Sequence, residues 1–97
     1  MKNMDFLKKA LEIKEKIDKV LSDLRVEAES GGGMVKAVCN GKGRVVELFI
    51  EPEVINPREK DMLEDLIIAA VNEAKRRAEE MAQKEIVKIT GFQIPGI

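Results

Sequence analysis

Two glycine-rich stretches, residues 30–33 and 40–43, are the first candidates for a chemical function in this 97-residue chain. Both resemble loops that hold phosphate groups with their backbone amides. Such a loop has to open a helix, because the amides at the helix N-terminus hold the anion. Here both stretches lead into runs rich in β-branched residues, and neither carries a Gly-Lys-Ser/Thr signature. We therefore interpret both as turns between strands.

The other groups that commonly carry catalysis or bind metals are scarce. The chain has no histidine, and its one cysteine, Cys39, lies among apolar residues, where a buried small side chain is expected rather than a reactive thiol. Asp61, Glu64 and Asp65 fall in the first turns of an expected helix, where the helix dipole explains them. No residues combine a nucleophile, a base and an oxyanion donor. The sequence predicts no enzyme, catalytic residue, metal site, cofactor or small-molecule substrate.

Basic side chains are the remaining candidates. The net charge of -1 gives no support for a polyanionic partner, and Glu12, Glu15, Glu79 and Glu80 weaken any positive patch. Without Trp or Tyr, base stacking on a sheet is disfavoured. The residues alone leave two interpretations open, a solvated helix surface or contact between helices and the phosphates of a duplex. Charge and helix position select six candidate DNA-binding residues: Lys8, Lys9, Lys16, Lys75, Arg76 and Arg77.

The elements that must carry these residues form an α+β fold. Phe6, Ile13 and Val20 belong to an apolar seam with heptad spacing, which predicts a long N-terminal helix over about residues 4–24. Alternating residues and turn signals predict a three-stranded antiparallel β-meander with strands at about 26–30, 34–40 and 44–50. Asn56 and Pro57 are typical of a helix start, so a long C-terminal helix is expected over about 57–85, followed by a short tail at 86–97. Residues 1–97 form a single domain.

The lengths of these elements predict association. A helix of about 28 residues is roughly 42 Å long, whereas a strand of about six residues spans roughly 20 Å. One small sheet cannot cover apolar stripes of that length, so a homodimer is expected. The candidate interface consists of apolar residues from the helices and the last strand: Ile13, Ile17, Val46, Leu48, Leu66 and Ala70. The start of the chain lacks the apolar core of a signal peptide and no stretch is long enough to cross a bilayer, so a cytoplasmic protein with no membrane partner is expected.

Three stretches carry a resemblance to a known family. Glu29–Ala37 with the following Asn40-Gly41 looks like an E-S/A-G-x-G-x-V-x-V/A hairpin and its Asn-Gly turn. The segment Asp61–Ala74 is similar to an L-E-D-L-x-x-A-A-x-N-x-A helix. Thr90–Ile97 looks like a T-G-G-x-x-x-P-G ending, with Phe92 in place of the second glycine. On these motifs nearly the whole chain resembles the YbaB/EbfC nucleoid-associated proteins of bacteria.

The resemblance implies a small α+β homodimer whose helices project from a central sheet somewhat like tweezers, and a DNA-binding role in the nucleoid. It places Arg76 and Arg77 where the family often has a basic pair. The sequence thus predicts a dimer that contacts double-stranded DNA mainly through backbone phosphates, with little base specificity. The alternative is a protein-interaction or chaperone-like scaffold dimer that docks a partner helix on the apolar seam of the first helix.

Overall fold

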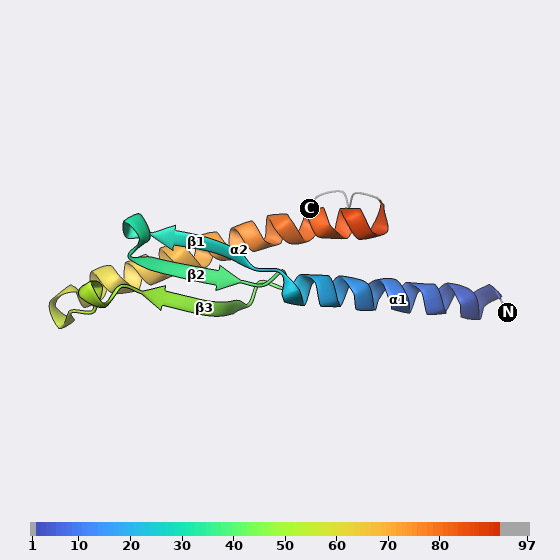
Figure 1. The fold of residues 1–97 in the computed structure, drawn as a ribbon, viewed down its shortest axis with the longest axis horizontal. Coiled ribbons are helices and arrows are strands. Elements are labelled where there is room, and N and C mark those ends of the chain that lie inside the picture. Colours follow the sequence, from blue (N-terminus) through green and yellow to red (C-terminus); the bar gives the residue numbers. More distant parts are fainter. Residues whose placement is uncertain (1, 92–97) are drawn as a thin grey trace.

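The computed structural model describes residues 2–91 and confirms the predicted order of a helix, a three-stranded meander and a second long helix (Figure 1). The elements are α1 (Lys2–Asp23), β1 (Val26–Ser30), β2 (Val35–Cys39), β3 (Val45–Ile50) and α2 (Lys60–Thr90). One 3₁₀ turn, Gly31–Gly33, joins β1 to β2, and two more, Pro52–Val54 and Pro57–Glu59, precede α2. The predicted tail at residues 92–97 lies outside the described residues.

The sheet is an antiparallel meander in the order β1-β2-β3. Ser30 pairs with Val35 across the glycine turn, where all three glycines have positive φ, so the stretch forms the predicted turn. Val35 in turn pairs with Ile50 on β3. A bulge at Val38 and Cys39 leaves Val46 without a partner in the register, which interrupts the alternation of side chains along β3.

The core lies between α2 and one face of β1 and β2. A ridge of small residues at every fourth position of α2 is buried: Ala70, Ala74, Ala78 and Ala82. The first three of these pack against the strand residues Ala28, Val35, Ala37 and Cys39. Cys39 is fully buried, as predicted, and among residues 2–91 the largest side chains with essentially no exposure are those of Val35 and Cys39. The alanines allow the helix to lie close to the sheet, and the resulting core is thin.

The ends of α2 differ in part from the predicted bounds of 57–85. Asn56 caps the start as predicted, its Oδ1 accepting from the Arg58 amide at 3.0 Å, but the first turn is 3₁₀ and α2 begins at Lys60. At the other end α2 continues to Thr90. The β-branched residues after Glu85 cost only tenths of a kcal/mol in a helix. Gly91, with φ +79° and its amide bonded to the Val87 carbonyl, is the C-cap.

The overall shape is strongly elongated because both helices run past the sheet. The molecule measures 67 × 22 × 16 Å, and its radius of gyration is 18.2 Å. A compact chain of this length has a radius of gyration of about 13 Å. Figure 1 shows α1 extending beyond the end of the sheet, with the C-terminal half of α2 passing beside its sheet-proximal part. Every side chain described from residue 3 to residue 16 is exposed, so α1 is anchored only near its C-terminal end.

Candidate nucleic-acid interface

The three candidate lysines of α1 lie on the projecting part of that helix. Lys8, Lys9 and Lys16 are exposed. Within residues 2–91, no ion pair or side-chain hydrogen bond holds any of these three lysines. Their ammonium groups are therefore available to an external anion without the loss of an internal partner.

The run of three basic residues in α2, Lys75, Arg76 and Arg77, differs from the α1 lysines because acidic neighbours bind the central arginine. The Arg76 guanidinium donates from Nε and Nη2 to the two carboxylate oxygens of Glu73, at 2.7 and 2.8 Å. Its Nη1 donates to Oε1 of Glu80. These contacts follow from the helix, since residues three and four positions apart lie on the same face. We refer to this group, Glu73, Arg76, Arg77 and Glu80, as the α2 ion-pair cluster.

The other two residues of the run are also bound within the chain. Arg77 donates to Oε2 of Glu73 at 3.0 Å and to the backbone carbonyl of Glu27 on β1 at 3.1 Å. Lys75 donates from Nζ to the Gly43 carbonyl at 2.7 Å, which joins α2 to the turn between β2 and β3. The hydrogen bond from Arg76 is the largest cause that lowers the pKa of Glu73 to about 2. Glu73 therefore remains an anion at neutral pH and holds both arginines.

The six predicted residues thus form two groups instead of one patch. Lys75, Arg76 and Arg77 lie where α2 leaves the sheet, as their contacts with Gly43 and Glu27 show. Lys8 and Lys9 belong to the free end of α1. At about 1.5 Å per residue, Lys9 lies about 18 Å along the helix axis from Leu21, where α1 meets the sheet. An anion that contacts both Lys9 and the basic residues of α2 must be extended.

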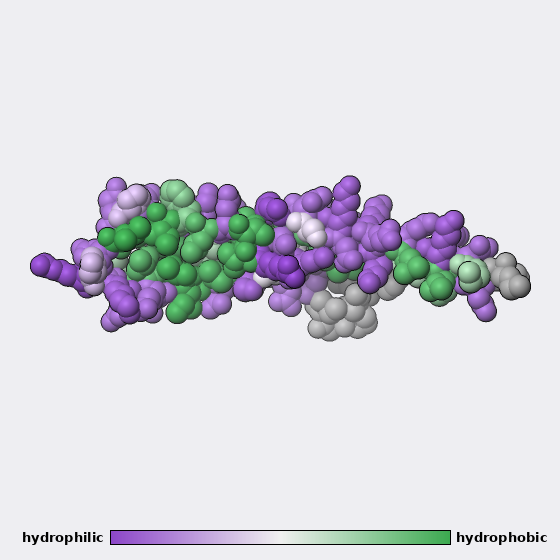
Figure 2. All heavy atoms as spheres, turned by 90° about the horizontal axis from the view of Figure 1, so that it is seen from below, coloured by the Kyte–Doolittle hydropathy of each residue, from purple (hydrophilic) through white to green (hydrophobic). Residues whose placement is uncertain are grey.

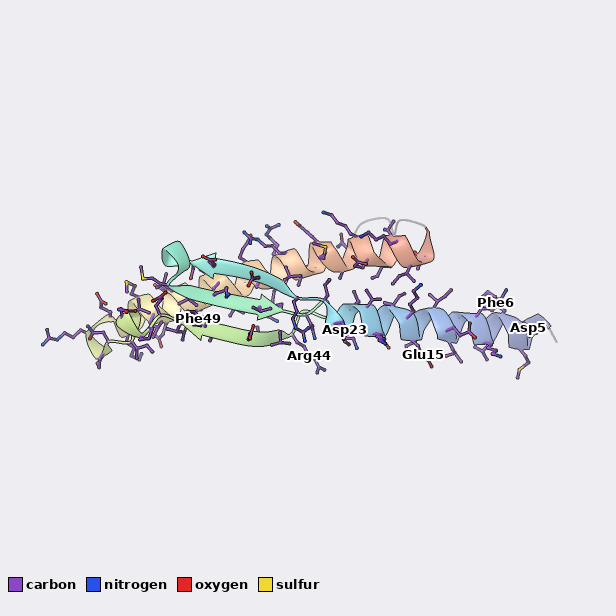
Figure 3. The ribbon with its side chains drawn as sticks, viewed as in Figure 1. Asp5, Phe6, Glu15, Asp23, Arg44 and Phe49 are labelled. Atoms are coloured by element: carbon purple, nitrogen blue, oxygen red, sulfur yellow. The ribbon has the colours of Figure 1, made fainter. Side chains whose placement is uncertain are left out.

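Three basic residues around the junction of α1 with the sheet were not among those predicted from the sequence. Arg25, Lys42 and Arg44 are exposed there. Figure 3 shows Arg44 near Asp23, at the end of α1. Arg25 donates to the carbonyls of Ser22 and Leu24 and so caps α1, while Lys42 lies 3.8 Å from Asp18. In the sequence these three residues were marked only by their position next to the expected turns. In the folded chain they lie at the same end of the sheet as Lys75.

The residues predicted for the dimer interface divide into an exposed set and a set that faces the chain's own core. Val46 and Leu48 on β3 are 43% and 45% exposed, and Ile13 on α1 is 43% exposed. Ile17 is half-buried. Ala70 is fully buried in the core of the single chain, and we therefore remove it from the interface set. Helical periodicity identified the apolar stripe of α2 but could not tell that the chain's own sheet covers this part of it.

Leu66 also faces the chain's own core. It packs against the buried cluster, and its backbone carbonyl accepts a hydrogen bond of 2.6 Å from the Ser30 hydroxyl. A Cβ built on Gly31 would lie 2.8 Å from Leu66 Cδ2, so this side chain fills the space beneath the glycine turn. Leu66 holds the β1–β2 turn against α2, and because it is only partly buried it stays a candidate for the dimer interface.

Residues 2–91 contain no group of three or more Cys, Asp or Glu side chains placed to hold a metal ion. Across the same residues, no helix is both long and apolar enough to span a membrane.

Comparisons with known proteins show what this chain is similar to. A nucleoid-associated protein of Caldanaerobacter subterraneus subsp. tengcongensis is 48% identical, over 96% of this chain and 87% of its own length. One of Anaeromyxobacter dehalogenans is also 48% identical, over all of this chain and 92% of its own. An uncharacterised protein of Helicobacter pylori has the same fold, with a TM-score of 0.74 and 22% identity over 88% of this chain and 89% of its own. The family model for YbaB/EbfC DNA-binding proteins matches residues 1–93, and the chain belongs to that family.

Proposed function

We propose that two copies of this chain associate and bind duplex DNA in the nucleoid, mainly through backbone phosphates and with little base specificity. The observation that carries the proposal is the projecting α1 helix with Lys8, Lys9 and Lys16 exposed and without internal partners. Relatives that are 46–48% identical over 96% of the chain are named nucleoid-associated proteins. A row of free ammonium groups on a helix suits the regular phosphates of a duplex.

The composition of α1 supports weak base specificity. Bidentate reading of base edges uses Arg or Lys on guanine and Asn or Gln on adenine, and among these the planar Arg fork is the most directional. The α1 sequence has no Arg and no Gln, and its one Asn is Asn3. Lysine is a flexible point charge, which fits phosphates without demanding one base sequence. A dimer carries two copies each of Lys8, Lys9 and Lys16. With one phosphate contact per lysine and 0.9 per phosphate, log affinity would fall against log salt with a slope of about -5.

The direct test is a fluorescence anisotropy titration of duplexes of two unrelated sequences with the wild-type chain. We expect binding to both duplexes with similar affinity and a steep loss of affinity as salt rises. The absence of binding to either duplex at low salt would refute the DNA-binding proposal. A large preference for one sequence would refute the proposed lack of base specificity.

The apolar surface around β3 supports association of two copies. Figure 2, which views the molecule from the β3 side, shows a broad hydrophobic area over the part that holds the sheet. Exposed apolar residues in this part of the chain include Val45, Val46, Leu48, Phe49 and Ile68, with exposures of 40–57%. β3 is also an edge strand, whose outer backbone groups have no partner strand within residues 2–91. A patch of this kind next to an open edge is typical of a protein interface.

We expect Leu48→Asp to convert the dimer to single chains, because it places a charge among the exposed apolar residues of β3. Light scattering coupled to gel filtration measures the mass. The matched control is Phe6→Asp, which introduces the same charge at a residue that is 76% exposed and lies near the free end of α1 (Figure 3). A dimer that survives Leu48→Asp, or one that Phe6→Asp disrupts equally, would contradict an interface on β3.

The second candidate function, docking of a partner helix on α1, is favoured by one observation. Phe6, Leu7, Leu11 and Ile13 expose apolar side chains along the projecting helix. Salt-insensitive capture of one identified protein by the wild type, lost in Phe6→Asp, together with a failure to bind duplex DNA, would favour this function over DNA binding.

A further inference from the structure

The turn between β2 and β3 makes a close contact with the last turn of α1. The Gly41 amide donates to the Leu21 carbonyl at 2.7 Å. Leu21 lies in the last turn of α1, and its carbonyl also accepts a longer hydrogen bond of 3.3 Å from the Leu24 amide just beyond the helix. Leu21 and Gly41 are both buried. This is a specific hydrogen bond from the sheet to the base of the projecting helix.

The contact leaves no room for a side chain on Gly41. A Cβ built at this position would lie 2.9 Å from both the Cα and the carbonyl oxygen of Leu21, and 3.0 Å from its Cδ2. Two of these three atoms belong to the backbone, so α1 itself would have to move. The backbone φ of Gly41 is not positive, whereas that of the nearby Gly43 is +81°. The glycine at position 41 is therefore required by the approach of α1, whereas the one at position 43 serves the turn.

The turn that carries Gly41 is itself held rigidly. Asn40 is 8% exposed, and its Oδ1 accepts from the amides of Lys42 and Arg44, at 2.9 and 3.1 Å. The Asn40 amide also donates to the Arg44 carbonyl at 2.9 Å. An Asn side chain that bonds the backbone in this way fixes the conformation of a turn. The position of Gly41 relative to the sheet is thus fixed, and α1 docks on a firm support.

We propose that Gly41 is a positioning residue that sets the direction of α1 and thereby the place where the α1 lysines meet DNA. The inference rests on the proposed function. Residues 3–16 are all exposed, so the direction of α1 is decided near its C-terminal end. Lys8 lies about 20 Å from Leu21 along the axis, at about 1.5 Å per residue. A tilt of about 10° at the joint would move Lys8 by about 3 Å, the length of one hydrogen bond.

The test compares Gly41→Ala with the wild-type chain, and it uses Gly43→Asn as a matched control in the same turn. A Cβ at Gly43 meets no atom within 4 Å, and Asn tolerates a left-handed conformation. Residual dipolar couplings of the backbone amides measure how α1 is oriented relative to β2 and α2. In the wild type and in Gly43→Asn we expect all three elements to share one alignment. In Gly41→Ala we expect the α1 couplings to be reduced or to require a different orientation, while those of β2 and α2 are retained.

DNA affinity is measured on the same three proteins. Gly41→Ala should bind duplex DNA about eightfold more weakly at 0.1 M salt for each phosphate contact that α1 loses, with a shallower salt dependence. Gly43→Asn should match the wild type. Unchanged α1 couplings and unchanged affinity in Gly41→Ala would overturn the proposal. It would also be overturned if the wild-type α1 couplings were already averaged by motion, and this result does not require the variant to fold.

The two proposals fail in different ways. If the wild type binds no duplex, the proposed function is wrong, and the couplings alone decide whether Gly41 sets the direction of α1. If the wild type binds and Gly41→Ala changes the α1 orientation without changing affinity, the positioning role toward DNA is wrong and the proposed function stands.

Discussion

The basic side chains of α1 and those of α2 carry the same charge but differ in what already binds them. Lys8, Lys9 and Lys16 are exposed and form no ion pair within residues 2–91, whereas Arg76 is held by two carboxylates and Arg77 by Glu73 and the Glu27 carbonyl. A phosphate that binds Arg76 has to displace an existing partner, and one that binds Lys9 does not. The density of positive residues along a sequence therefore does not measure how readily a helix binds an anion.

The largest effect on this contrast should come from the triple variant Lys8→Ala, Lys9→Ala, Lys16→Ala. We expect the salt dependence to become shallower by up to about 2.7 per chain, at 0.9 per phosphate contact. The affinity at 0.1 M salt should fall by about a hundredfold or more, because each lost contact costs about eightfold under those conditions. Anisotropy titrations at several salt concentrations measure both quantities. Lys60→Ala, which removes an exposed lysine already paired with Glu64, is the control. An unchanged slope in the triple variant would exclude α1 from the binding surface.

The double variant Arg76→Ala, Arg77→Ala should have a smaller effect per residue. Each arginine has to break its contact with Glu73 before it can bind a phosphate, which offsets part of its binding free energy. We therefore expect the slope of log affinity against log salt to change by less than about 1.8, the value for two free cations. The same titrations measure the slope. A larger loss per residue here than in the α1 triple variant would reverse the contrast and make α2 the main binding helix.

Glu80→Gln should strengthen DNA binding. The change removes one of the two carboxylates that hold Arg76 and retains the shape of the side chain. Exposed ion pairs contribute up to about 1 kcal/mol, so we expect a gain in affinity of about twofold to fivefold. Glu79→Gln alters the net charge equally, but its carboxylate forms no ion pair within the described chain. Equal gains in both variants would show that net charge alone matters and that the ion pair is irrelevant.

The smallest effect concerns the acid stability of the α2 ion-pair cluster. The folded pKa of Glu73, about 2, lies below the ordinary value of 4.5, mainly because Arg76 donates to its carboxylate. A lowered folded pKa contributes stability that is complete above about pH 4.5 and is lost as the pH falls toward 2. The carboxyl carbon shift of Glu73, followed by NMR, should titrate near pH 2. Glu73→Gln should flatten this part of the curve of melting temperature against pH, whereas Glu79→Gln should leave it in place.

Most of the fold could be predicted because its signals are local. Alternation of apolar and charged residues gave β1 at its observed bounds, and the Asn56-Pro57 cap gave the start of the second helix within a few residues. The end of that helix was placed at Glu85 instead of Thr90, since the β-branched residues that follow are mildly unfavourable in a helix but do not stop it.

The candidate site could be predicted less well, because its properties depend on contacts between elements. Periodicity marked Leu66 and Ala70 as apolar but could not show that the chain's own sheet covers them. The acidic neighbours of Arg76 were visible as a weakening influence, yet the bidentate contact with Glu73 appears only in the folded helix. Gly41 looked like any other turn glycine, because the backbone that excludes a side chain there comes from Leu21, 20 positions earlier.

The alanine ridge of α2 has a thermodynamic consequence. A core built largely on Ala70, Ala74 and Ala78 against Ala28 and Ala37 contains little apolar surface per residue, so we expect a single chain to have a small heat-capacity change on unfolding and little stability of its own. In the dimer that we propose, most of the stability would therefore reside between the chains, and folding and association would be a single equilibrium. The melting temperature would then rise with protein concentration, which makes dilution alone a way to unfold the protein.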